Sequence, residues 1–158
     1  LRENGEPEAR ESPPELQRYF TVASDPSQEA AVLQARQSPG LLVEGPPGTG
    51  KSQTIVNMVA DAIGRQRSLL IVCQKHAALE VVHKRLVAEG LGQRIVMLND
   101  VNRDREPVIR NIREQLEALF ADAGGAQGWE RQRERLAARI EALEGELDRY
   151  HQSLHRVD

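Results

Sequence analysis

GPPGTGKS, at residues 45–52, is the stretch of sequence that decides the fold of this chain. It matches the complete GxxxxGK[ST] pattern of a P-loop, whose glycines let backbone N–H groups converge on phosphate oxygens without obstruction by Cβ atoms. Lys51 would reach the β- and γ-phosphates of a nucleotide as the catalytic lysine, and the hydroxyl of Ser52 would bind Mg²⁺. The motif therefore predicts ATP and Mg²⁺ as ligands. The predicted nucleotide-binding residues of this segment are Gly45, Pro46, Pro47, Gly48, Thr49, Gly50, Lys51, Ser52 and Gln53.

The sequence on either side of the loop has the context that a P-loop needs. Leu41-Leu42-Val43-Glu44 is predicted to be a short buried strand, and it runs directly into the first glycine. After Lys51, apolar residues follow helical spacing up to Gly64, which stands where a C-terminal cap would be. This helix would present its positive N-terminal end to the phosphates. A plain glycine-rich turn with a surface lysine is therefore the weaker interpretation.

Strand and helix patterns alternate around the loop. Buried strands are predicted over residues 69–73 and 94–98, with a helix over residues 77–89 between them. A further helix begins before the loop, with Asp25 as N-cap and Pro26 in the first helical position. This order is typical of an α/β fold in which helices cover a parallel sheet.

The last third of the chain is predicted to be helical. Residues 107–120 have an amphipathic pattern, residues 123–128 form a glycine-rich break, and an apolar heptad seam follows, interrupted at Arg133. The seam consists of Trp129, Leu136, Ile140, Leu143, Leu147, Tyr150, Leu154 and Val157. Such a seam needs a partner. We expect either a returning stalk helix from outside this chain or self-association through residues 129–157.

Composition limits the class of protein. The net charge of −3 excludes a globally basic nucleic-acid-binding domain, although it leaves room for a local basic groove. A single cysteine, Cys73, cannot form an internal disulfide, and this favours a cytoplasmic location. The sequence has no apolar run of about 18 residues, so no membrane insertion is expected. Residues 1–20 are predicted to be a flexible linker, residues 21–104 the P-loop core, and residues 105–158 a helical arm.

Residues 24–98 resemble the first half of the motor core of superfamily 1 DNA/RNA helicases, in the branch typified by the nonsense-mediated decay helicase. Asp25-Pro26-Ser27-Gln28 is similar to the family's Q motif, and GPPGTGKS to its motif I. VCQKHAALE, at residues 72–80, is similar to motif Ia, and residues 94–98 fall where the family has a further strand before a helical insertion. The resemblance implies a partial RecA-like parallel sheet with flanking helices, followed by a helical or coiled-coil arm.

Gln28 has two interpretations. The family resemblance implies that its side chain reads the adenine edge of ATP. Asp25-x-x-Gln28 is also a capping box, in which the glutamine bonds back to the backbone of the N-cap residue. The two roles are compatible with each other.

Lys75 and His76 are candidate nucleic-acid contacts, because motif Ia of the family touches the nucleic-acid backbone. The chain departs from the family pattern here, since relatives have Ser or Thr and then Asn where this sequence has Lys75-His76. Lys75 could still hold a phosphate as a point charge. An exposed helix start with two solvated polar residues is the alternative.

The resemblance implies the ATP-binding portion of a nucleic-acid-dependent ATPase or helicase, an ATP hydrolase in its full-length form. The expected partners are DNA or RNA, in single-stranded form, and a second motor lobe outside this chain. Asp100 follows a predicted strand but lacks the adjacent Glu of a Walker B motif, so the catalytic acids are not expected here and the chain alone should be inactive. The alternatives are a P-loop NTPase of another class, such as a kinase or an AAA-type remodeller, and a coiled-coil interaction module with a vestigial nucleotide site.

Overall fold

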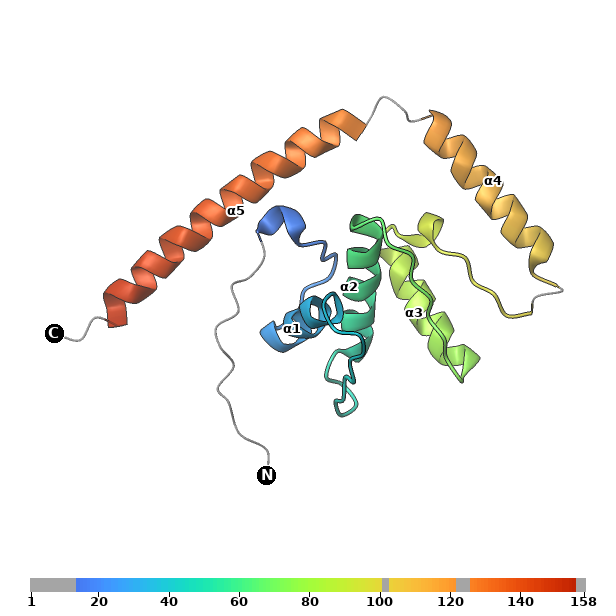
Figure 1. The fold of residues 1–158 in the computed structure, drawn as a ribbon, viewed down its shortest axis with the longest axis horizontal. Helices are drawn as coiled ribbons and strands as arrows, with labels where there is room; N and C mark the ends of the chain where they lie inside the picture. The colour runs from blue at the N-terminus through green and yellow to red at the C-terminus, as the bar shows by residue number, and fades with distance from the viewer. Residues whose placement is uncertain (1–13, 101–102, 122–125, 156–158) are drawn as a thin grey trace. The chain divides into compact units, whose positions relative to one another are not determined.

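A computed structural model describes residues 14–100, 103–121 and 126–155, and the regular structure in these ranges is helical. Contacts divide the chain into two units, which are described separately: residues 19–123, here called the P-loop unit, and residues 1–18 with 124–158, here called the α5 unit. The elements are η1 (Glu15–Gln17), α1 (Pro26–Ala35), α2 (Lys51–Gly64), α3 (His76–Ala88), η2 (Gly92–Arg94), α4 (Arg105–Ala121) and α5 (Ala126–His155) (Figure 1).

Helix α2 is the centre of the P-loop unit, and it lies between α1 and α3 (Figure 1). Its apolar face carries Val56 and Val59, which pack against Val82 and Leu86 of α3 in one buried cluster. Burial of each such side chain contributes about 1.5–3 kcal/mol. Partly buried residues surround this cluster: Val22, Ile55, Ile63, Ile71, Leu91 and Ile95. The small core therefore joins α2 to α3.

Asn57, on α2, is a fully buried polar residue that fixes the segment before α1. Its Oδ1 accepts hydrogen bonds from the backbone N–H groups of Thr21 (3.0 Å) and Val22 (3.2 Å). Its Nδ2 donates to the carbonyl oxygen of Val22 at 3.0 Å. Because the amide is satisfied on both sides, its burial costs little and ties residues 21–22 to α2.

A buried ion pair joins the other end of α1 to α2. Arg36, the C-cap residue of α1, donates from Nε to Oδ2 of Asp61 at 3.1 Å, and a terminal guanidinium nitrogen donates to Oδ1 at 2.5 Å. This two-point geometry matches the planar guanidinium to the carboxylate. Helix α1 is thus held to α2 at its C-terminal end as well as through the segment that precedes it.

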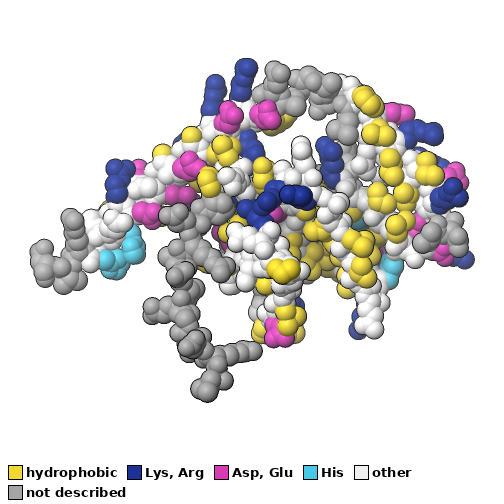
Figure 2. Space-filling view, in the orientation of Figure 1, with side chains coloured by type: hydrophobic (Ala, Val, Ile, Leu, Met, Phe, Trp, Pro, Cys, Tyr) yellow, Lys and Arg dark blue, Asp and Glu magenta, His cyan; other side chains and the backbone are white. Residues whose placement is uncertain are grey.

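The expected parallel sheet is not formed in the described residues. The segments predicted as strands, residues 41–44, 69–73 and 94–98, contain no assigned strand. Leu42, Leu70 and Val72 are 80%, 85% and 82% exposed, and hydrophobic side chains show at the surface around α3 and its neighbouring segments (Figure 2). A parallel strand needs neighbouring strands for its backbone hydrogen bonds and cover on both faces. These segments do not supply them to one another, so the sheet of the predicted α/β fold is not seen in the described residues.

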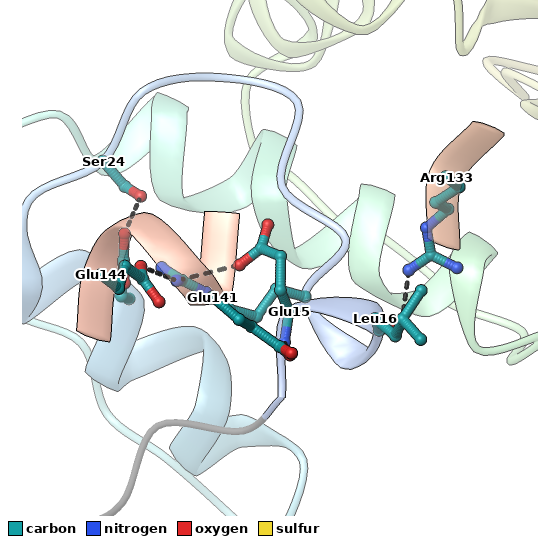
Figure 3. A network of polar contacts seen from close by, with 8 residues as sticks. Glu15, Leu16, Ser24, Arg133, Glu141 and Glu144 are labelled. Atoms are coloured by element: carbon teal, nitrogen blue, oxygen red, sulfur yellow. Dashed lines mark hydrogen bonds and ion pairs between the residues drawn. The ribbon is translucent and has the colours of Figure 1, made fainter. Parts of the chain in front are cut away.

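The α5 unit contains one long helix and the short η1. The backbone N–H of Glu15 donates to Oε1 of Glu141 at 3.0 Å, the guanidinium of Arg133 donates to the carbonyl of Leu16, and Arg18 lies 3.7 Å from Glu144 (Figure 3). Helix α5 begins at Ala126, inside the expected glycine-rich break.

Several sequence predictions fall wholly or partly outside the described residues. These are residues 1–13 of the predicted linker, residues 123–125 of the predicted break, and Val157 of the seam. The limits predicted for the three domains stay a prediction, although the contacts place α4 in the P-loop unit. None of the helices described combines the length and apolar character required to cross a lipid bilayer.

Replacement of Arg36 by Ala should lower the free energy of unfolding by about 3 kcal/mol, because it leaves the buried Asp61 carboxylate without its counter-ion. Urea denaturation followed by circular dichroism measures this change. Arg110→Ala is the matched control, since it removes an exposed pair to Glu106 and should cost less than about 0.5 kcal/mol. Equal effects of the two variants would contradict the conclusion that the Arg36–Asp61 ion pair holds α1 to α2.

Candidate nucleotide-binding site

The P-loop leads into α2 through left-handed glycines. Gly48 has φ of 88° and Gly50, the N-cap of α2, has φ of 77°, a region that residues with a Cβ rarely adopt. The carbonyl of Gly50 accepts hydrogen bonds from the backbone N–H groups of Gln53 (2.8 Å) and Thr54 (3.0 Å). The N–H groups of Lys51 and Ser52 belong to the first turn, which has no intrahelical acceptors, so they point toward the loop.

Close contacts also require glycine at Gly45 and Gly50. A Cβ on Gly45 would lie 2.6 Å from Oγ1 of Thr49, and a Cβ on Gly50 would overlap the side-chain nitrogen of Gln28. A Cβ on Gly48 would meet no atom within 4 Å. The loop is therefore compact at its two ends and open at Gly48. This arrangement fits a phosphate group that approaches the backbone closely.

Lys51 folds back along the loop. Its ammonium group donates to the carbonyl oxygens of Gly45 and Pro46, the latter at 2.7 Å. The carbonyl of Pro46 also accepts from the hydroxyl of Thr49 at 2.8 Å. The loop therefore closes around the cation of Lys51, and this charge lies among the backbone groups of residues 45–51.

Gln28 forms the capping box and contacts the P-loop at the same time. Its backbone N–H donates to Oδ1 of Asp25 at 2.9 Å, and its Oε1 accepts from the N–H of Asp25 at 3.2 Å. The capping interpretation is therefore confirmed. The Nε2 group of the same side chain donates to the carbonyl of Thr49 at 3.1 Å. The structure thus brings Gln28 next to the phosphate loop, 21 residues further along the chain.

The carboxylate of Asp25 is stabilised in its charged form. The hydroxyl of Ser27 and then the backbone N–H of Gln28 donate to it, and together they lower the pKa of Asp25 below its ordinary value of 3.8. The capping box is therefore built on an ionised carboxylate at neutral pH.

The remaining predicted site residues lie on two helices. Ser52 is half-buried in the first turn of α2, and Gln53 follows it with its Oε1 close to Gly50. Lys75 is the exposed N-cap residue of α3. His76 is exposed as well, and its Nδ1 lies 3.5 Å from Oε1 of Glu80, a pair that is ionic when the imidazole is protonated. No group of three or more His, Cys, Asp or Glu side chains suitable for a metal occurs in the part of the chain that the structure describes.

Asn57 and the Arg36–Asp61 pair are the important residues that sequence reasoning missed. A signal existed, because Asn57 interrupts the apolar run Ile55-Val56-Asn57-Met58-Val59 on a helix whose face is buried. A polar residue in such a run must find hydrogen-bond partners. The sequence could not show that the partners are the backbone groups of residues 21–22.

Asp25→Asn should change how stability depends on pH, because asparagine keeps the cap and cannot ionise. In the wild type, the folded state has the lower pKa. The stabilisation is therefore present in full above the unfolded pKa and is lost as the pH falls through the folded pKa. Urea unfolding midpoints measured from about pH 6 to about pH 2 should fall further for the wild type than for the variant. A difference between the two that is constant across this range would contradict the lowered pKa.

Comparisons with known proteins identify the family of this chain. Residues 23–156 match a family model described as an AAA domain, AAA_11. An uncharacterized ATP-dependent helicase of Mycoplasma genitalium (MG140) is 44% identical over 68 residues, which are 43% of this chain and 6% of that protein. The DNA-binding protein SMUBP-2 of Mesocricetus auratus is 30% identical over 110 residues, which are 69% of this chain and 11% of that protein.

The chain thus spans about a tenth or less of the length of these relatives. No solved structure matches it. The family model covers most of the sequence and includes the capping box, the P-loop and all the helices from α1 to α5. The chain therefore belongs to this AAA domain family and is the N-terminal part of the motor core of a superfamily 1 helicase-type P-loop ATPase.

Proposed function

We propose that this chain is the ATP-binding portion of a nucleic-acid-dependent ATPase or helicase that couples ATP hydrolysis to movement on DNA or RNA or to its remodelling. The contact between Gln28 and the carbonyl of Thr49 carries the proposal. It joins the residue that the helicase family uses for adenine to the loop that holds phosphates. The capping box alone accounts for the bond between Gln28 and the backbone of Asp25, but not for the further bond to the P-loop.

Different residues of the loop would contact different parts of the bound nucleotide and its metal. Lys51 would leave the carbonyls of Gly45 and Pro46 for the β- and γ-phosphates, and the N–H groups of Gly48 and Gly50 would donate to phosphate oxygens. Ser52 would hold Mg²⁺ through its hydroxyl. The metal, when bound, neutralises charge on the phosphates. The donor set of one lysine, one hydroxyl and a helix N-terminus fits this chemistry.

Gln28 would read the adenine base. A glutamine amide has one donor and one acceptor and can match the N6 and N7 atoms of adenine. In the structure both ends of this amide are engaged, by the N–H of Asp25 and by the carbonyl of Thr49. These weak, partly exposed bonds can be exchanged for bonds to the base. The capping box then keeps the side chain near its binding position before ATP arrives.

The strands that complete the parallel sheet, and the catalytic acids, would come from outside this chain. The family is of the P-loop α/β type, and the segments 41–44, 69–73 and 94–98 expose apolar side chains that strands would bury. Neighbouring strands from the rest of the protein would pair with them. A second motor lobe would supply the remaining groups for hydrolysis, so this chain alone should bind ATP weakly and be inactive in hydrolysis.

Lys75 and His76 would contact the nucleic acid. Both are exposed at the N-terminal end of α3, where a cation can pair with a phosphate without loss of a buried contact. The similarity to a relative named as a DNA-binding protein supports a nucleic acid as the partner, without assigning these two residues.

Lys51→Ala should weaken ATP binding by the intact protein roughly thirtyfold, because a charge-assisted bond to phosphate is worth about 2 kcal/mol. Fluorescent ATP-analogue titration measures the affinity. Lys84→Ala, at an exposed position of α3, is the control and should bind as the wild type does. Unchanged affinity in Lys51→Ala would show that the nucleotide site is vestigial.

Gln28→Ala should lower the preference for ATP over GTP about tenfold, because one specific base contact is worth about 1–3 kcal/mol. Competition titration of the intact protein with ATP and GTP gives this ratio. The ratio is independent of any general weakening of α1 by loss of the capping box. Gln34→Ala, on the exposed side of the same helix, should leave it unchanged. Equal losses for both nucleotides would assign Gln28 to capping alone.

A further inference from the structure

Helix α5 presents an apolar seam that the described residues leave largely exposed. Its members recur at alternating spacings of three and four, so they are the a and d positions of heptads. The seam residues in the described part of α5 are Trp129, Leu136, Ile140, Leu143, Leu147, Tyr150 and Leu154, and all except Ile140 are more than half exposed. The short η1 contacts α5 at Glu141 and at Arg133, the charged position that interrupts the seam, and the adjacent Arg18 lies near Glu144. Six large apolar side chains on one helix stripe indicate an interaction surface.

The charges along α5 identify what covers this seam. Residues 126–140 hold four arginines and two glutamates, whereas residues 141–155 hold four acidic residues and one arginine. The two halves of the helix therefore have opposite net charge. A second copy of α5 that ran in the same direction would place like charges together. A copy that ran in the opposite direction would place each basic half against an acidic half.

We propose that a second copy of this chain packs its α5 antiparallel against this seam. In antiparallel pairs, a positions face d positions. One register then matches every described position: Ile140 faces Leu143 of the second copy, Leu147 faces Leu136, and Leu154 faces Trp129. The symmetry axis passes between the two copies of the Ile140–Leu143 layer. The interface is therefore self-complementary, as a two-fold dimer requires.

The residues that flank the seam fit the same register. Arg139 and Glu146 both occupy g positions, which face one another in an antiparallel pair. Arg139 of one chain then lies beside Glu146 of the other, and the symmetry produces this pair twice. On the opposite flank, Glu130 lies beside His151 of the second copy.

The register also explains why the seam is interrupted at Arg133. This a position faces the d position of Tyr150 in the second copy. A guanidinium group can stack on the face of a tyrosine ring, whereas two apolar residues there would specify no direction. The bond from Arg133 to the carbonyl of Leu16 lies in the plane of the guanidinium group, whereas stacking uses a face of that plane, so the two contacts are compatible.

Sedimentation equilibrium of the 158-residue chain at micromolar concentrations tests the proposal. We expect a monomer–dimer equilibrium for the wild type. Arg139→Glu should raise the dissociation constant roughly tenfold, because it places like charges together on both sides of the axis. The double variant Arg139→Glu/Glu146→Arg should restore wild-type dimerisation, because the two residues exchange roles.

Arg135→Glu is the matched control, since it makes the same charge change at an outward c position of the same helix. Circular dichroism confirms that α5 stays helical in each variant. A chain that is monomeric at all concentrations with α5 ordered would overturn the proposal and leave the seam to a helix from outside this chain. Failure of the double variant to restore the dimer, or an equal effect of Arg135→Glu, would overturn the antiparallel register.

Discussion

The side chain of Asn57 makes the hydrogen bonds on which the arrangement of the P-loop unit depends. It is fully buried on α2 and holds residues 21–22, immediately before α1, through three bonds to the backbone. Asp61, one turn further along α2, holds the opposite end of α1 through Arg36. Since α2 also begins at the P-loop, one helix positions the phosphate loop and, through α1, the residue that touches it. Gln28 therefore meets Thr49 as a consequence of contacts made several residues away.

Local patterns in the sequence predicted the P-loop, its helix and the capping box well. GPPGTGKS leads into α2, Asp25 and Gln28 form both bonds of the box, and α1 and α3 begin within one residue of the expected positions. These features depend on residues close together in the chain, so spacing and composition are sufficient to find them. Family membership then follows from motifs that are local as well.

The sheet could not be predicted in the same way. An apolar run such as residues 69–73 indicates that a segment prefers burial, but strand pairing needs a neighbour whose position no local pattern contains. Leu70 and Val72 are exposed because no such neighbour lies against them in the described residues. The contacts of Asn57 and Arg36 that hold α1 to α2 were missed for a related reason, because their partners are about 25 to 36 residues away along the sequence. Arg133, in contrast, was visible as a break in the seam. Its proposed position opposite Tyr150 depends on the antiparallel direction of the second copy, which was inferred from the opposite charges of the two halves of α5.

The central claim is that Gln28 and the P-loop form one nucleotide site, and nuclear magnetic resonance of the chain tests it most directly. Amide resonances of Gly45, Gly48, Gly50, Lys51 and Ser52 should shift when either ATP or inorganic triphosphate is added with Mg²⁺. The side-chain NH₂ resonances of Gln28 should shift with ATP well beyond any shift that triphosphate causes, because only ATP carries the base. Equal shifts of Gln28 with both ligands, or no response of the loop to either, would contradict the account.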